Sequence, residues 1–217
     1  MKHALSIEVF FDFICPWCLI GQRHLQGALA QLRQERPEIE VTLRWRGVQL
    51  LPGMARTGQP FEAFYRKRLG SDEAVRQRQA QVRAAAEAAG VSIDFSRISR
   101  MPNTADAHRL LQRAVALGDP LVVEALLERL FAAYFQQGKD LGDPVTLLHI
   151  AQACGLSPSQ VADCLRGDAS PFIGANAAAA DGVPCFSFNQ RRVVSGAQPV
   201  AVLLAAMRES LEEAALA

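Results

Sequence analysis

The chain has 217 residues, of which half are hydrophobic, and a formal net charge of +1, so it is long enough for one domain of ordinary core size or one domain with an insertion. The near-neutral charge gives no reason to expect nucleic acid or an anionic membrane as a partner. Because no run approaches the roughly 18 apolar residues of a membrane helix, we expect a soluble globular protein.

The first predicted element is a strand over residues 7–14, where a nearly all-apolar run rich in Phe, Val and Ile ends at Cys15. Such short runs are typical of central strands. A helical pattern starts at Pro16 and ends before Pro37, and Val41, Leu43 and Trp45 then alternate with polar residues as in a second strand. Strand, helix and strand predict a βαβ unit with parallel strands.

The junction of the first strand and helix carries the motif Cys15-Pro16-Trp17-Cys18. Pro16 suits the first helical position, which makes Cys15 the N-cap and puts Cys18 in the first turn. At this spacing the two sulfurs can reach each other. The helix terminus also favours the thiolate of Cys15, which is the reactive form. The motif therefore predicts a redox site.

A zinc site and a structural disulfide are the other interpretations of the cysteines, and both fit the sequence less well. A zinc site usually has a second Cys or His pair at short spacing, whereas the other three cysteines are isolated, so we expect no metal. An odd total of five cysteines also argues against a structural disulfide framework and fits a reducing compartment. Cys154 and Cys164 are interpreted as structural, and Cys185 as a buried small hydrophobe, with a regulatory or mixed-disulfide role as the alternative for Cys185.

The middle of the chain, from about residue 61 to residue 167, is predicted to be entirely helical. Asp119, Asp143 and Ser157 each stand before a proline as N-caps, and glycines end the segments. A strong apolar stripe lies between these signals, formed by Val123, Leu126, Leu127, Leu130, Phe131 and Tyr134. We expect a helical insertion within an α/β chain.

Strand signals return near the C-terminus. Residues 183–188 and 192–194 are predicted strands on either side of a turn at Asn189-Gln190, which indicates an antiparallel hairpin. Pro199 opens a final helix with an apolar stripe. The two ends of the chain together predict a βαβ unit followed by a ββα unit.

The stretch from Asp12 to Gly21, Asp-Phe-Ile-Cys-Pro-Trp-Cys-Leu-Ile-Gly, resembles the active-site segment of the DsbA-like thioredoxin superfamily, in particular its FrnE-type branch. Related branches are the kappa-class glutathione transferases and the 2-hydroxychromene-2-carboxylate isomerases. The resemblance covers nearly the whole chain. It implies an α/β thioredoxin fold, with residues 1–60 and 168–217 as the thioredoxin-like domain and residues 61–167 as an inserted helical domain.

The resemblance also implies a cis bond between Val183 and Pro184, in a loop whose backbone binds extended substrate near the active sulfur. Many thioredoxin-like proteins carry a buried acid six residues before the first active cysteine, where this chain has Val9. Asp12 and Glu8 are the candidate substitutes. Trp17 either provides an apolar platform for substrate beside Pro16 or covers the helix end.

Two further segments match the family. Asn103 and His108 belong to the start of an insertion helix that faces the active-site cleft in relatives, although a helix cap and a packed histidine are the structural alternatives. Ser195 and Gly196 match a turn that receives the γ-glutamyl end of glutathione in glutathione-using relatives. We expect free N–H groups there to capture a carboxylate, with a simple helix cap as the alternative.

These observations predict a cytoplasmic protein-disulfide oxidoreductase in which exposed Cys15 attacks and the more buried Cys18 resolves. Disulfide-containing proteins or small thiols are the expected substrates. No tightly bound cofactor is expected, glutathione is the candidate co-substrate, and the sequence does not specify the oligomeric state. A glutathione-dependent isomerase or transferase is the alternative enzyme, disfavoured because both cysteines are present. A binding module or chaperone is the non-enzymatic alternative.

Overall fold

The computed structural model describes residues 4–174 and 182–215, and the chain divides into two compact units. The first unit contains residues 1–48, 88–91 and 174–217, and the second contains residues 49–87 and 92–173. The loop after the second strand and the segment 168–173 therefore group with the second unit, whereas the sequence assigned both to the thioredoxin-like domain. Residues 1–3, 175–181 and 216–217 of that expected domain lie outside the described part of the chain.

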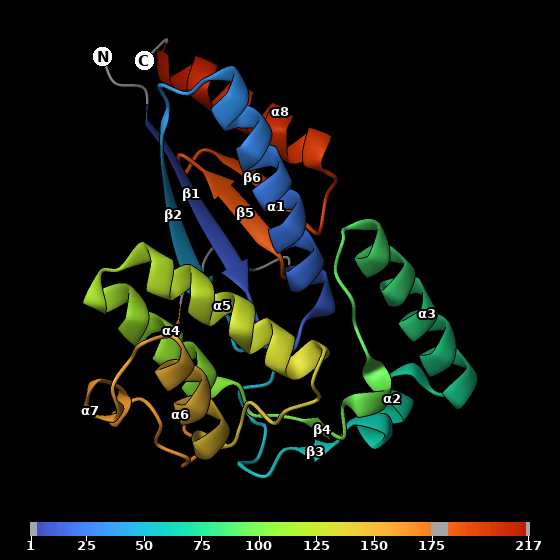
Figure 1. Cartoon of the computed structure of the whole chain (residues 1–217). Helices are drawn as coiled ribbons and strands as arrows, with labels where there is room; N and C mark the ends of the chain where they lie inside the picture. Colours follow the sequence, from blue (N-terminus) through green and yellow to red (C-terminus); the bar gives the residue numbers. More distant parts are fainter. Residues whose placement is uncertain (1–3, 175–181, 216–217) are drawn as a thin grey trace. The chain divides into compact units, whose positions relative to one another are not determined.

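The first unit is built on a four-stranded sheet with the order β2-β1-β5-β6 (Figure 1). Strand β1 (Ala4–Phe11) pairs in parallel with β2 (Glu40–Gly47) and antiparallel with β5 (Cys185–Phe188), which in turn pairs with β6 (Arg192–Ser195). The βαβ and ββα units predicted from the sequence are therefore confirmed. Together they form the thioredoxin fold.

The end of β1 differs from the prediction. The strand stops at Phe11 rather than Ile14, and the following residues form a turn in which the Cys15 N–H donates to the Asp12 carbonyl at 3.1 Å. An apolar sequence cannot distinguish a buried strand from a buried turn, because both bury their side chains. Helix α1 (Pro16–Glu35) begins at the predicted residue.

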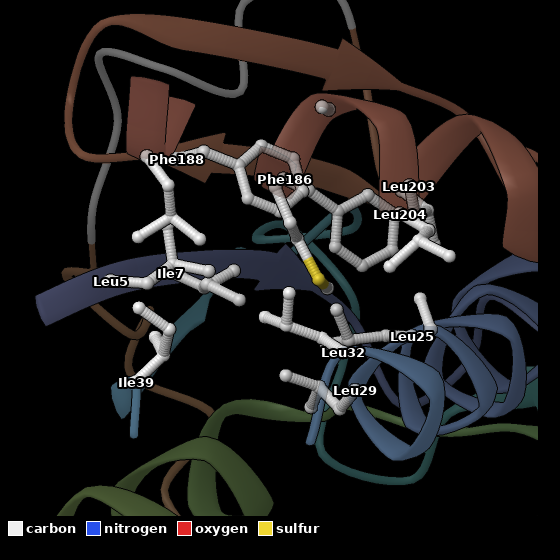
Figure 2. Close-up of a cluster of buried hydrophobic side chains, with 14 of the residues drawn as sticks. Leu5, Ile7, Leu25, Leu29, Leu32, Ile39, Phe186, Phe188, Leu203 and Leu204 are labelled. Carbon is white, nitrogen blue, oxygen red and sulfur yellow. The ribbon is translucent and has the colours of Figure 1, made fainter. Parts of the chain in front are cut away.

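A hydrophobic core joins the sheet to helix α1 and helix α8 (Val200–Ala215) (Figure 2). Leu5, Ile7 and Val9 project from one face of β1 because alternate side chains of a strand share a face. The helices add the apolar stripes that the sequence indicates, and α1 and α8 contact each other. This core packs the middle of α1 against β1, and the cysteine motif lies between the carboxyl end of β1 and the start of α1.

The second unit consists mainly of helices, with one correction to the all-helical prediction. Two short strands, β3 (Gln59–Pro60) and β4 (Arg100–Met101), pair antiparallel. The helices are α2 (Phe61–Leu69), α3 (Asp72–Ala88), a 3-10 turn at Phe95–Arg97, α4 (Ala105–Leu117), α5 (Pro120–Phe135), α6 (Pro144–Ala153) and α7 (Pro158–Val161). Strands of only two residues are too short to give a recognisable signal in the sequence.

The predicted helix caps are confirmed in the second unit. The carboxylates of Asp119 and Asp143 accept from N–H groups of the first turns of α5 and α6, and Ser157 forms a capping box at α7. The apolar stripe of α5 is buried as predicted. Within the described residues, no helix is long and apolar enough to span a bilayer.

Candidate active site

The two motif cysteines lie at the N-terminus of α1, as the sequence predicts. Cys15 is the N-cap and Pro16 occupies the first helical position. Both thiols are free, and the Cys18 thiol is hydrogen-bonded to that of Cys15. Two thiols in such contact can close into a disulfide after a small movement of the sulfurs.

The prediction that Cys15 is exposed is wrong. Its exposed fraction is 7%, against 2% for Cys18, so both residues are buried, although Cys18 is the more buried of the two, as predicted. The cause is the loop before β5: the Cys15 Sγ donates to the Val183 carbonyl at 3.6 Å. Because Cys15 and Val183 are far apart in sequence, local sequence patterns cannot predict that the loop buries Cys15.

The buried environment acts strongly on Cys18. Burial raises the pKa of its thiol well above the ordinary value, and the hydrogen bond and charge of Cys15 raise it further. A hydrogen bond from the Asp12 backbone opposes this rise in pKa, whereas the Asp12 carboxylate adds to it. Cys18 is therefore held as a thiol, and a base must take its proton before it can attack.

The Val183–Pro184 peptide bond is cis and lies beside Cys15, so this prediction is confirmed in both respects. Pro184 is buried, and its carbonyl accepts from the Gly196 N–H at 2.8 Å. This contact also places the Ser195-Gly196 turn next to the cis-proline loop, as the sequence analysis expects.

The expectation of free N–H groups in that turn needs correction. The Gly196 N–H is bonded to Pro184, and the Gln198 N–H donates to the Gly196 carbonyl at 2.9 Å. The Gln198 side chain closes the turn by donating to the Ser195 carbonyl at 3.1 Å. Two donors that were assigned to a ligand carboxylate therefore stabilise the turn itself.

The two candidate acids near the motif have different surroundings. Glu8 projects from β1 and accepts from the guanidinium of Arg46 on the neighbouring strand, with Nε at 2.9 Å. Asp12 is fully buried in the turn before Cys15 and interacts electrostatically with Cys18. Of the two substitutes for the family's buried acid, Asp12 is the one beside the thiols.

Pro16 and Trp17 are half-buried in the first turn of α1, and their predicted contact with substrate stays a prediction. Cys185, the neighbour of Pro184, is buried in β5. In the part of the chain that the structure describes, no group of three or more His, Cys, Asp or Glu side chains has the arrangement of a metal site.

Asn103 and His108 belong to the second unit, at the start of α4. The Asn103 carboxamide donates to the Met54 carbonyl at 2.6 Å and accepts from the Ala105 N–H at 2.9 Å and the Gln49 side chain at 3.0 Å. His108 is buried and stacks on Phe172, with ring centroids 5.1 Å apart. Both have structural contacts within their unit, and their role in substrate binding stays a prediction.

Sequence analysis missed the residues that hold the start of α4 in place. Asp106 forms a buried ion pair with Arg109 at 2.5 Å and accepts from the Gly167 N–H at 2.7 Å. Gln49 accepts from the Phe172 N–H at 2.8 Å while donating to Asn103. These contacts explain why the segments around residues 49 and 167–173 group with the second unit. No local pattern signals them, because the partners are far apart in sequence.

Three comparisons relate the chain to known proteins. The family model of the DSBA-like thioredoxin domain matches residues 6–208. The chain is 29% identical to a probable DsbA oxidoreductase from Streptomyces coelicolor, whose crystal structure it matches with a TM-score of 0.79 over 96% of this chain and 91% of that one. It is 24% identical to the uncharacterized protein YwbO of Bacillus subtilis over 75% of this chain and 72% of that protein.

A more distant structure has the same fold. The cytosolic disulfide reductase DsbM from Pseudomonas aeruginosa, in its structure with GSH, is 19% identical and has a TM-score of 0.52 over 97% of this chain and 98% of that one.

Proposed function

Because the chain belongs to the family of DsbA-like thioredoxin domains, we propose that it is a thiol–disulfide oxidoreductase in which Cys15 attacks and Cys18 resolves. The observation that carries this proposal is the pair of free, hydrogen-bonded thiols at the start of α1, one of which faces the Val183 carbonyl. The family establishes redox chemistry in general, and the roles of the two cysteines are our inference.

The reaction has two exchange steps. The Cys15 thiolate attacks one sulfur of a substrate disulfide, the substrate S–S bond breaks, and the leaving sulfur takes a proton as a thiol. The Cys18 thiolate then attacks the Cys15 sulfur and displaces the second substrate thiol. The enzyme pair loses two electrons and becomes a disulfide, while the substrate gains two. The reverse sequence oxidises a substrate dithiol.

Asp12 supplies the base for the second step in this proposal. The raised pKa of the Cys18 thiol disfavours spontaneous ionisation, and the nearby buried carboxylate of Asp12 can accept its proton as Cys18 attacks. Glu8, which is paired with Arg46 on the neighbouring strand, has no such role. Asp12 thus substitutes for the acid that Val9 replaces.

We propose disulfide-containing proteins or small thiols as substrates, and glutathione as a co-substrate. The exposed Gly182 and half-buried Val183 beside Cys15 leave backbone groups with which an extended chain could pair. We also propose Asn103, His108 and the Ser195-Gly196 turn as substrate-binding residues. Gly196 contributes by shaping the turn, because its N–H is already bonded to the Pro184 carbonyl. The cytosolic DsbM, whose structure contains GSH, supports glutathione use and a cytoplasmic setting.

The test is reduction of insulin disulfides by the protein with dithiothreitol or glutathione as electron donor. Wild-type protein is expected to accelerate insulin reduction, and the Cys15→Ser variant is expected to lose this activity. Turnover that persists in Cys15→Ser would overturn the proposal and favour the glutathione-dependent isomerase or transferase. Chaperone activity that is equal in both proteins, without turnover in either, would favour the binding module.

A further inference from the structure

Helix α1 contains a glycine at a position where a glycine is costly. Gly21 is buried in the interior of the helix, three residues after Cys18, so the two residues share a face. A glycine in a helix interior is less stable than alanine at the same position. Gly21 is the last residue of the segment from Asp12 to Gly21 that resembles the family's active site, and no function is predicted for it from the sequence.

The surroundings of Gly21 leave no room for a side chain. A Cβ atom at this position would lie 3.0 Å from Cγ of Pro184 and 3.1 Å from Cζ of Phe186. The proline ring is rigid, and Phe186 is fully buried in the core of the first unit. Since neither neighbour can rotate away, a methyl group on residue 21 would push Pro184 away from the helix.

Pro184 links the groups on either side of it. Val183, directly before it, accepts from the Cys15 thiol at 3.6 Å, and the Pro184 carbonyl accepts from Gly196. A shift of the proline ring therefore moves the Val183 carbonyl relative to Cys15 Sγ.

We propose that Gly21 is a positioning residue for disulfide exchange: its missing side chain lets Pro184 pack against α1 and so sets the Val183 backbone beside Cys15. This inference rests on the proposed function, because it assigns Gly21 to the same reaction. It accounts for a buried glycine that costs helix stability.

The same helix contains a matched control. At Gly27, an added Cβ would lie 3.0 Å from Cγ2 of Val200, which is as close as the contact at Gly21. The neighbour there is a single half-buried valine at the first residue of α8, whereas Gly21 faces both a proline ring and a fully buried phenylalanine. Gly27 is also twelve residues from Cys15, roughly 18 Å along the helix axis, so a small shift there does not reach the thiol.

The experiment compares Gly21→Ala with Gly27→Ala in urea unfolding and in insulin reduction under fully folded conditions. Gly21→Ala is expected to lower kcat/KM about tenfold, since small misplacements of reacting groups are costly. Gly27→Ala is expected to remain within about twofold of wild type. Equal activity of the two alanine variants would overturn the inference while leaving the proposed function intact.

A double-mutant cycle tests whether Gly21 acts through Pro184. Pro184→Ala removes the ring through which Gly21 is proposed to act, so Gly21→Ala added to it is expected to lower kcat/KM by a smaller factor than it does in wild type, whereas independent effects would multiply. If Gly21→Ala alone does not fold, the comparison of Pro184→Ala with the double variant decides the question. Multiplying losses would overturn the inference. Wild-type protein without disulfide turnover would overturn the proposed function, and this inference with it.

Discussion

Two helices of this chain begin with motifs that the sequence marked for chemistry, and the two starts use their polar groups differently. At α4, the Asn103 side chain accepts from the N–H of Ala105, the first residue of the helix, and binds the loop at Met54, and Asp106 is paired with Arg109. At α1, the N-cap Cys15 makes no capping hydrogen bond with its side chain, and its thiol contacts Val183.

The difference separates structural polar groups from reactive ones. The buried groups of α4 have strong partners that hold distant segments of the second unit, so their removal should cost stability. The thiols of α1 make weak hydrogen bonds, because sulfur is a poor donor and acceptor, so their replacement should cost chemistry and little stability. A polar motif at a helix start is thus diagnosed by how strongly its side chains are bound.

The largest effect is expected at Cys15. Cys15→Ser should lower insulin-disulfide turnover by at least about 1000-fold, because a serine hydroxyl cannot form the mixed disulfide. The free energy of unfolding should change by only about 1 kcal/mol. Cys154→Ser is the control, since Cys154 ends α6 in the second unit and is half-buried. A comparable loss of turnover in Cys154→Ser would break the comparison.

The next effect is on stability, at α4. Arg109→Ala should reduce the free energy of unfolding by about 3 kcal/mol, because it leaves the buried Asp106 carboxylate without its cation. Urea unfolding measures this loss, and turnover of the folded variant should stay near the wild-type value. The matched control is Arg113→Ala, one turn further along α4, whose partner Asp163 is 66% exposed. Its expected loss is below about 1 kcal/mol.

The same pair of variants can also show that the comparison of the α1 and α4 starts is wrong. A folded Arg109→Ala protein with kcat more than tenfold below wild type would mean that the start of α4 takes part in the chemical step, beyond the proposed binding of substrate by Asn103 and His108. The distinction between structural and reactive starts would then fail.

Asp12→Asn should affect the second chemical step. The amide is close in size to the carboxylate but cannot accept the Cys18 proton, so resolution of the mixed disulfide should slow about 100-fold, at the low end of general-base effects. Rapid quenching with acid and mass spectrometry would show the mixed disulfide on Cys15 accumulating, as it would in Cys18→Ala.

The control for Asp12 is Glu8→Gln, which removes a carboxylate that is paired with Arg46. This variant should resolve the mixed disulfide at the wild-type rate. Equal slowing in both variants would show that a general loss of negative charge, rather than a base beside Cys18, causes the effect.

Much of the fold could be predicted because its signals are local. The start of α1 follows from Pro16, the caps of α5 and α6 from aspartates before prolines, and the hairpin turn from Asn189-Gln190, which adopts positive φ angles of 49° and 57°. The cis Val183–Pro184 bond came from the family resemblance, since the base rate of cis proline is low.

The failures have a common physical cause, which is contact between residues far apart in sequence. The burial of Cys15 depends on Val183, and the Gly196 N–H is taken by Pro184. Likewise, the side chain of Gln49 joins Asn103 to Phe172. A cap, a turn and a periodic stripe are written in a few adjacent residues, whereas these contacts exist only in the folded chain.

The smallest expected effect is the part of the pH dependence that Cys18 contributes, beside the contributions of Cys154 and Cys164, whose pKa values burial also raises. The pKa of the Cys18 thiol is raised well above its usual range, mainly by burial. In the unfolded chain, the thiol ionises near its ordinary pKa of about 8.5. Above that pH the unfolded state has released the proton while the folded state still holds it, so the free energy of unfolding falls as pH rises. The slope for one proton is at most about 1.4 kcal/mol per pH unit, until pH reaches the folded pKa.

Urea unfolding of the reduced protein between neutral and alkaline pH measures this slope. Cys18→Ala lacks the thiol, and wild-type protein with the Cys15–Cys18 pair oxidised has no ionisable sulfur there, so both should have a shallower slope than reduced wild type. Cys18→Ala keeps the Cys15 thiol, so its difference from reduced wild type isolates Cys18, and the other alkaline titrations cancel in that difference. Because Arg109→Ala leaves Cys18 unchanged, this variant should keep the contribution of Cys18 to the slope of the free energy of unfolding against pH, despite its lower stability. A reduced wild-type slope equal to that of Cys18→Ala would show that Cys18 ionises normally in the folded protein, which would remove the need for Asp12 as its base.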